Sequence, residues 1–271
     1  MSGPVDRRLI AVNGVELEYV EQGSGVPVVF SHGGASDVRY WAPQRAAFAA
    51  YRFISFSRRF HGAGAWPSTA DASPEAHADD LIAVVERADQ GAVHLVGFSA
   101  ATALLAAVRA PSSFRSLTIF EPNVPSLLTD DPDDRAALEA WQSVIAHLRI
   151  EHRDDADSHA RHWFELVNSS GAGAFERQPE DFRQMWLENF GAKRSPSTGP
   201  ELTCADLAGV HIPTLALGSE HGMPYSRRIL QRVAECIPGC ELKILPRATH
   251  FASYQSPSAF NAAVLDFIAR S

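Results

Sequence analysis

The sequence lacks the features of a membrane protein or a nucleic-acid-binding protein. The first residues, Met1 to Arg8, are charged without a following apolar segment, and no apolar run approaches the about 18 residues of a membrane span. Lys and Arg number 24 against 32 Asp and Glu, which gives a formal net charge of -8 and no basic excess to neutralise phosphates. We therefore expect a cytoplasmic protein with neither a membrane nor a nucleic acid as partner.

Cysteine is also scarce. Cys204, Cys236 and Cys240 form an odd set of three, which favours reduced thiols over a disulfide framework. Pro238 and Gly239 interrupt the helix between the last two, and no further His or Cys completes a zinc pattern. No metal site is therefore expected.

Short apolar segments alternate with segments of helical composition along most of the 271 residues. Asn13-Gly14, between two alternating apolar runs, predicts a β-hairpin over Leu9 to Val20. Six further strands are predicted at Pro27–Ser31, Phe53–Ser57, Val93–Gly97, Leu117–Glu121, Pro213–Gly218 and Glu241–Leu245. The helical segments between most of them indicate crossover connections, and therefore an α/β protein with a mostly parallel sheet.

One connection is much longer than a crossover helix requires, since residues 122–212 separate two predicted strands. Helices are predicted within it at Asp134–Arg149, Asp154–Asn168 and Pro179–Phe190, and loops at Ser169–Gly173 and Ser195–Pro200. We expect a helical cap over residues 125–200, inserted after the sixth strand, and a core made of residues 1–124 and 201–271. Trp141 and Trp186 are expected to pack the cap helices together.

Ser99 lies where a predicted strand turns directly into a predicted helix, in Gly97-Phe98-Ser99-Ala100-Ala101. A serine on such a turn stands clear of the sheet, and the next backbone N–H can meet an oxyanion at the helix N-terminus. The alternative is that Ser99 only caps the helix. We interpret Ser99 as a nucleophile, while Phe98 either lines the substrate pocket or packs in the core.

A glycine-rich turn, His32-Gly33-Gly34, follows the first predicted parallel strand. Glycines let the backbone present an N–H to a developing negative charge. We assign the oxyanion donors to the N–H groups of Gly34 and Ala100, with Gly33 as a possible substitute. His32 is expected to order the loop.

His250 follows the last predicted strand and precedes an amphipathic helix that begins after Pro257. A nucleophilic serine needs a base of near-neutral pKa within hydrogen-bond reach, and a loop at the same edge of the sheet can deliver it. Position therefore selects His250 among the 11 histidines.

These motifs and the order of the strands resemble the α/β-hydrolase superfamily over essentially the whole chain. The resemblance implies an eight-stranded sheet, a triad in the chain order serine, acid and histidine, a cap after the sixth strand, and no metal or organic cofactor. Ala101 departs from the usual Gly-x-Ser-x-Gly pattern, and residues 58–64 depart from it where many members show an acidic residue before Gly-x-Gly. We expect Arg58, Arg59 and His61 to be solvated loop residues, with a position at the pocket mouth as the alternative.

The triad acid has two candidates. Most members of the superfamily carry it after the seventh strand, but there the sequence places His221 or Gly222 at the expected position, and Glu220 lies one residue early. Glu121 ends an apolar strand and is followed by Pro122, and a buried carboxylate there needs a partner such as His250 Nδ1–H. We predict Glu121 as the acid, with Glu220 as the alternative. Glu121-Pro122 also resembles the acid position of the mycoestrogen lactone hydrolases of the zearalenone type.

The predicted function is hydrolysis of a small carboxylic ester or lactone through an acyl-enzyme on Ser99, with a small molecule as the partner and the oligomeric state left open. Carbon–carbon bond hydrolases also keep a serine at this turn. A lyase or a cofactor-independent oxygenase could use His250 as a base without an acyl-enzyme, and a binding receptor could retain the pocket without chemistry.

Overall fold

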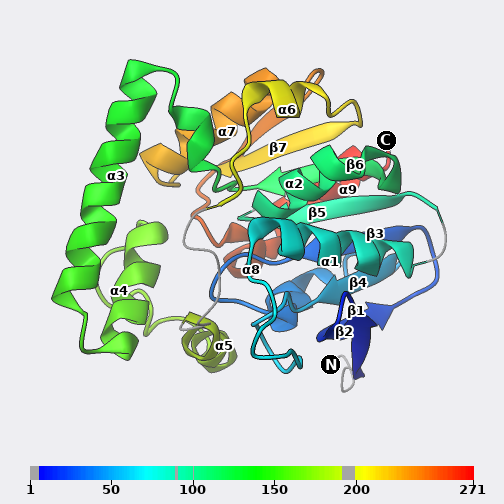
Figure 1. Ribbon diagram of the computed structural model, residues 1–271, viewed down its shortest axis with the longest axis horizontal. Helices are drawn as coiled ribbons and strands as arrows, with labels where there is room; N and C mark the ends of the chain where they lie inside the picture. Colours follow the sequence, from blue (N-terminus) through cyan, green and yellow to red (C-terminus); the bar gives the residue numbers. More distant parts are fainter. Residues whose placement is uncertain (1–5, 89–90, 100, 191–198) are drawn as a thin grey trace.

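A single sheet forms the centre of the computed structural model, which describes residues 6–88, 91–99, 101–190 and 199–271. The strand order is β1-β2-β4-β3-β5-β6-β7-β8 (Figure 1). The β1/β2 and β2/β4 pairs are antiparallel, and the other neighbouring pairs are parallel. The predicted eight-stranded, mostly parallel sheet is confirmed. Its strands are β1 (Arg7–Val12), β2 (Val15–Gln22), β3 (Pro27–Ser31), β4 (Arg52–Phe56), β5 (Val93–Phe98), β6 (Phe114–Phe120), β7 (Thr214–Ser219) and β8 (Glu241–Leu245).

The turn between β1 and β2 has the conformation that its sequence predicts. Asn13 has a φ of 43° and Gly14 a φ of 76°, the two positive values that a tight two-residue hairpin turn requires. Along the central strands β3 and β5 every residue is buried, because helices cover both faces of the sheet. This double burial explains why those segments are continuous apolar runs rather than alternating ones.

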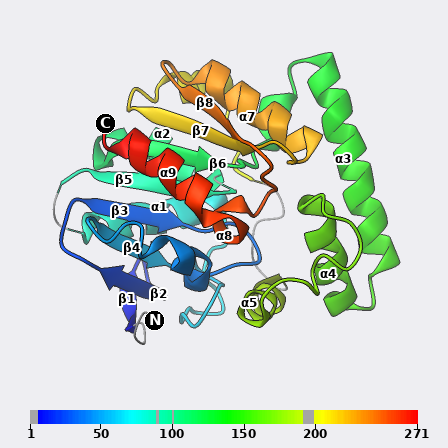
Figure 2. The same cartoon turned by 180° about the vertical axis from the view of Figure 1, so that it is seen from behind.

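Helices cover both faces of the sheet (Figures 1 and 2). Buried residues of α1 (Pro74–Glu86), α2 (Ala101–Arg109) and α7 (Pro224–Cys236) share one hydrophobic core. Buried residues of η1 (Val38–Gln44) and α9 (Pro257–Ile268) belong to a second core, and Figure 2 shows α9 across the other face of the sheet. Shorter helical segments are η2 (Pro111–Ser113), η3 (Pro125–Leu128), α6 (Cys204–Ala208) and α8 (Ala252–Gln255). No helix among the described residues is long and apolar enough to cross a membrane.

The insertion after β6 is helical, as predicted. It contains α3 (Pro132–Glu151), α4 (Ala156–Val167) and α5 (Glu180–Phe190), which lie together to one side of the sheet in both views (Figures 1 and 2). Trp186 is buried against Phe164 of α4 and against Phe251, which follows β8. Trp141 is only partly buried and stacks on Tyr225 of α7 at 5.4 Å. The boundaries 125–200 stay a prediction, and residues 195–198 of the predicted loop lie outside the described residues.

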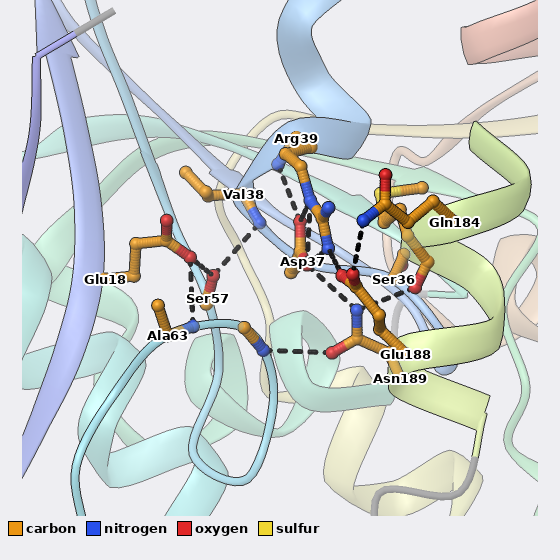
Figure 3. Close-up of polar contacts among 12 residues, drawn as sticks. Glu18, Ser36, Asp37, Val38, Arg39, Ser57, Ala63, Gln184, Glu188 and Asn189 are labelled. Atoms are coloured by element: carbon orange, nitrogen blue, oxygen red, sulfur yellow. Dashed lines mark hydrogen bonds and ion pairs between the residues drawn. The ribbon is translucent and has the colours of Figure 1, made fainter. Parts of the chain in front are cut away.

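The end of α5 is held to the core by a buried polar cluster (Figure 3). Asp37, which is 0% exposed, accepts hydrogen bonds from the Arg39 guanidinium and from Asn189 Nδ2. The Asn189 Oδ1 in turn accepts the Gly62 N–H at 2.9 Å, and Arg39 also pairs with Glu188 at 2.5 Å. The cluster therefore joins the cap helix α5 to the loops that follow β3 and β4.

The expectation of reduced thiols is wrong for two of the three cysteines. Cys204 and Cys236 form a disulfide, with a Cα–Cα distance of 5.0 Å, and Cys240 is free. Packing explains the error: α6 begins at Cys204, α7 ends at Cys236, and the two helices lie against each other. Spacing along the chain carries no information on this contact.

Candidate active site

Ser99 lies on a sharp turn between β5 and α2. Its φ of 51° is in the left-handed region, which a non-glycine residue adopts only at a cost of about 1–3 kcal/mol. The turn is fixed because Ser99 N–H donates to Phe120 O at 2.9 Å and Ala101 N–H donates to Ser99 O at 2.8 Å. The side chain is partly exposed, which distinguishes Ser99 from the buried residues of β5 that precede it.

The glycine-rich loop after β3 lies directly against this turn. A Cβ added to Gly33 would come within 2.8 Å of Ser99 Cβ and 3.0 Å of the Phe98 ring, so only glycine allows this approach. Gly34 is exposed, and a Cβ there would meet nothing within 4 Å. Its N–H makes no hydrogen bond within the described part of the chain. Ala100, the other predicted donor, lies outside the described residues.

His250 and Glu121 meet at the same edge of the sheet. The His250 Nδ1 lies 3.1 Å from Glu121 Oε2, and Ser219 N–H donates to the other carboxylate oxygen at 2.7 Å. Glu121 is 4% exposed and has a φ of 50°, just past the end of β6. A carboxylate oxygen accepts a hydrogen bond from Nδ1–H of His250, and in that tautomer the lone pair of the imidazole lies on Nε2.

The alternative acid, Glu220, lies elsewhere. Its Oε2 accepts the Arg247 N–H at 2.6 Å, and its side chain is exposed. Gly222, one of the two residues at the position where the resemblance predicts the acid, explains how Glu121 fits. A Cβ at Gly222 would lie 3.2 Å from both oxygens of the Glu121 carboxylate. The absence of a side chain after β7 therefore makes room for an acid from β6.

Phe98 packs in the core beside this pair. Its ring is 2% exposed, stacks on Tyr40 at 4.7 Å and contacts the His250 ring at 5.0 Å. Of the two expectations for Phe98, core packing is the one that these contacts support. The side chain flanks the imidazole and limits its rotation.

The expectation that Arg58, Arg59 and His61 are solvated is wrong, because all three are buried. Arg59 forms a bidentate pair with Asp80 of α1 at 2.6 and 2.7 Å. Arg58 donates to the Gly33 carbonyl at 2.9 Å and to Thr102 Oγ1 at 3.1 Å. The partners lie far away in the sequence, so a polar loop sequence does not reveal them.

His32 orders the loop as expected. Its Nε2 accepts the Arg58 backbone N–H at 2.9 Å, which leaves Nδ1 to donate to the Gly33 carbonyl at 2.7 Å. Burial, together with the nearby Arg58 cation, holds the pKa of His32 well below 6.5, so the ring stays neutral. Among the described residues, no group of three or more His, Cys, Asp or Glu side chains is placed to hold a metal ion.

Comparisons with known proteins show the family and the fold of the chain. The family model described as "Alpha/beta hydrolase family" matches residues 28–263. A non-heme chloroperoxidase from Kitasatospora aureofaciens is 24% identical over 267 residues, covering 94% of this chain and 97% of that protein. Two solved structures are similar in fold. A bromoperoxidase from Bacillus anthracis has a TM-score of 0.79 and 21% sequence identity, and the match covers 97% of this chain and 100% of that one. The enol-lactonase from Burkholderia xenovorans has a TM-score of 0.75 and 19% identity, and the match covers 97% of this chain and 100% of that one.

Proposed function

Because this chain belongs to the alpha/beta hydrolase family, we propose that it is a serine hydrolase that cleaves a small carboxylic ester or lactone through an acyl-enzyme on Ser99. The observation that carries the proposal is the buried hydrogen bond between His250 Nδ1 and Glu121. It orients a histidine with a free Nε2 at the sheet edge where β5 and β6 end, and Ser99 stands on the turn after β5.

The proposed mechanism uses these groups in two half-reactions. His250 Nε2 takes the proton from Ser99 Oγ as that oxygen attacks the carbonyl carbon, and the N–H groups of Gly34 and Ala100 hold the resulting oxyanion. The tetrahedral intermediate then expels the alkoxide, which His250 protonates, and the acyl-enzyme remains. Water, deprotonated by the same imidazole, attacks the acyl-enzyme and releases the acid. Glu121 stabilises the imidazolium in both halves.

Esters and lactones are the substrate classes that we favour for two reasons. The enol-lactonase named above is a lactone-cleaving protein on the same fold. The acid position Glu121-Pro122 also resembles that of the zearalenone-type lactone hydrolases. In a lactone the leaving alkoxide stays tethered to the acyl group, so the ring opens without a second product.

A fluorophosphonate probe tests the nucleophile. The expected result is one covalent adduct on Ser99, together with turnover of p-nitrophenyl esters of graded chain length or of members of a lactone panel. A lyase, an oxygenase or a receptor without acyl chemistry predicts no such adduct. A carbon–carbon bond hydrolase predicts the adduct but no turnover of either panel.

Replacing Glu121 by glutamine tests the acid, because the structure fixes which way the amide must point. The Ser219 N–H can only donate, so the amide oxygen must occupy the Oε1 site and the NH2 group must face His250 Nδ1 at about 3 Å. His250 Nδ1 must then accept, which moves the proton to Nε2 and removes the lone pair that should receive the Ser99 proton. We expect kcat to fall roughly 10²- to 10⁴-fold, as for other triad acids held in the wrong tautomer.

Glu220→Gln is the matched control. Its carboxylate accepts a single backbone N–H, that of Arg247, and an amide oxygen can accept the same bond. We expect less than about a threefold change in kcat. A large loss in Glu220→Gln and none in Glu121→Gln would transfer the acid role to Glu220 and leave the acyl-enzyme mechanism standing.

A further inference from the structure

Arg58 is a buried cation without a carboxylate ion pair among the described residues. It is 8% exposed. Burial lowers the pKa of its guanidinium to about 10, so the group is still charged at neutral pH. A charge without a counter-ion in a protein interior is costly, and hydrogen bonds to neutral acceptors must stabilise it. For Arg58 those acceptors are the Gly33 carbonyl and Thr102 Oγ1.

The Gly33 carbonyl receives an unusual number of hydrogen bonds. Besides Arg58 Nη2 at 2.9 Å, His32 Nδ1–H donates to it at 2.7 Å and Ser36 Oγ–H at 3.2 Å. A carbonyl oxygen has two lone pairs, so three donors converging on one oxygen leave it little freedom to rotate. One of the three carries a full positive charge and therefore makes the stronger type of bond.

Fixing this carbonyl also fixes the N–H on the other side of the same peptide unit. The bond between Gly33 and Gly34 is a planar trans peptide, so its C=O and N–H point in opposite directions. That N–H belongs to Gly34, which is exposed and makes no hydrogen bond within the described part of the chain. Two consecutive glycines would otherwise let this peptide rotate freely.

We propose that Arg58 is a positioning residue that orients and polarises the Gly33–Gly34 peptide, so that the Gly34 N–H is a preorganised donor to the oxyanion. The inference rests on the proposed function and assigns a role to a buried residue outside the proposed triad. Arg58 acts twice. Its hydrogen bond fixes the orientation of the Gly33 carbonyl. Its charge also polarises the peptide, which makes the Gly34 N–H on the opposite side a stronger donor.

The second bond of Arg58 adds to this role. Thr102 lies in the first turn of α2, the helix that follows Ser99, so one guanidinium joins the oxyanion loop to the nucleophile helix. The two parts of the site come from β3 and β5, which are neighbours in the sheet but lie far apart in the sequence. A single rigid, planar group bonded to both holds their separation constant.

The test compares Arg58→Met with Arg58→Lys in the full chain. Met fills a similar volume without uncovering a buried carboxylate, so folding should persist, and the melting temperature checks this. Active sites are counted with the fluorophosphonate probe, and kcat, KM and the Ki of a trifluoromethyl ketone are measured per active site. The ketone forms a tetrahedral adduct on Ser99, so its Ki reports the oxyanion interaction while KM reports ground-state binding.

For Arg58→Met we expect kcat to fall roughly 10- to 100-fold, Ki to rise by the same factor and KM to change less than about threefold, since losing an oxyanion donor outright costs ~10²–10³. Arg58→Lys keeps the charge as a less directional donor and should be intermediate. Thr102→Val, which leaves the Gly33 carbonyl bonded but removes the bond from Arg58 to α2, should raise Ki by a smaller factor than Arg58→Met. If Arg58 has only a structural role, Arg58→Met will show fewer active sites but an unchanged Ki. That result would overturn the inference. A wild-type chain with neither adduct nor turnover would instead refute the proposed function.

Discussion

Three buried histidines should make this protein unstable in mild acid. His32, His61 and His77 are each 1% exposed, and the His61 ring lies 5.2 Å from His32 and 6.4 Å from His77. Burial, reinforced by the cation of Arg58, lowers the pKa of His61 to about 3 and of His77 to about 2, and holds that of His32 well below 6.5. The folded protein therefore keeps all three rings neutral at a pH where the unfolded chain protonates them.

The sign and the size of the effect follow from proton linkage. Below pH 6.5 the unfolded chain binds more protons than the folded protein, so the free energy of unfolding falls as the pH falls. The stabilisation is fully present above pH 6.5 and is lost progressively down to about pH 3 for His61 and about pH 2 for His77. At pH 5 His61 and His77 each cost about 2 kcal/mol, and the two together about 4 kcal/mol, while His32 shifts the stability in the same direction. A typical domain has only about 5–15 kcal/mol in total.

Urea unfolding followed by tryptophan fluorescence at pH 7.5 and pH 5 measures this loss. His77→Leu sharpens the test, because neither ring nitrogen of His77 has a hydrogen-bond partner among the described residues, and leucine therefore breaks no bond. This variant should recover about 2 kcal/mol at pH 5 relative to the wild type. His147→Gln, on an exposed side chain of α3, is the control and should recover nothing. Equal unfolding free energies at the two pH values would refute the reasoning.

Other predictions concern the site and the disulfide. Ser99→Ala should abolish ester or lactone turnover, and substantial residual turnover would exclude the covalent mechanism. The melting temperature should stay at or above that of the wild type, since the Ser99 side chain makes no hydrogen bond within the described residues. His250→Ala should be nearly as damaging to kcat as Ser99→Ala, and the double variant no worse, because triad members act as a unit; a fully active single variant would place the base elsewhere. The double variant Cys204→Ser/Cys236→Ser should lose roughly 3–4 kcal/mol of unfolding free energy, because the bond closes a loop with a sequence separation of 32, whereas Cys240→Ser should lose almost none. Thiol titration that finds three free cysteines in the native protein would contradict that assignment.

Local sequence patterns predicted the sheet and the residues that its strand ends carry. The predicted bounds of β3 and β8 agree with the observed ones. Ser99 and Glu121 directly follow β5 and β6, and His250 lies in the loop after β8; parallel strands bring their carboxyl ends to one edge of the sheet. The positions of these three residues follow from where the strands end along the chain, and the apolar runs of the sequence predict those ends.

Burial of charged loop residues could not be predicted in the same way. Arg59 is buried because Asp80 of α1 meets it, and Arg58 because the Gly33 carbonyl and Thr102 do. Each of these contacts joins residues at least 21 positions apart, so the local composition describes only a polar turn. The disulfide between Cys204 and Cys236 has the same origin, since the packing of α6 on α7 decides it.

Two departures from the family pattern share one physical explanation. After β4 the pattern expects an acidic residue before Gly-x-Gly, and this chain has none there, but Glu18 of β2 places its carboxylate at the turn and accepts bonds from Ser57 Oγ–H and Ala63 N–H. After β7 the pattern expects an acid, and the carboxylate of Glu121, which follows β6, lies next to Gly222 at that place. Each carboxylate lies next to a glycine. A Cβ added to Gly62 would lie 2.6 Å from Glu18 Oε2, and a Cβ added to Gly222 would lie 3.2 Å from both oxygens of Glu121. A carboxylate is needed at a point in space, and a neighbouring strand can supply it wherever a missing side chain leaves room. A glycine at or next to such a position therefore directs the search to carboxylates on or just after the adjacent strands.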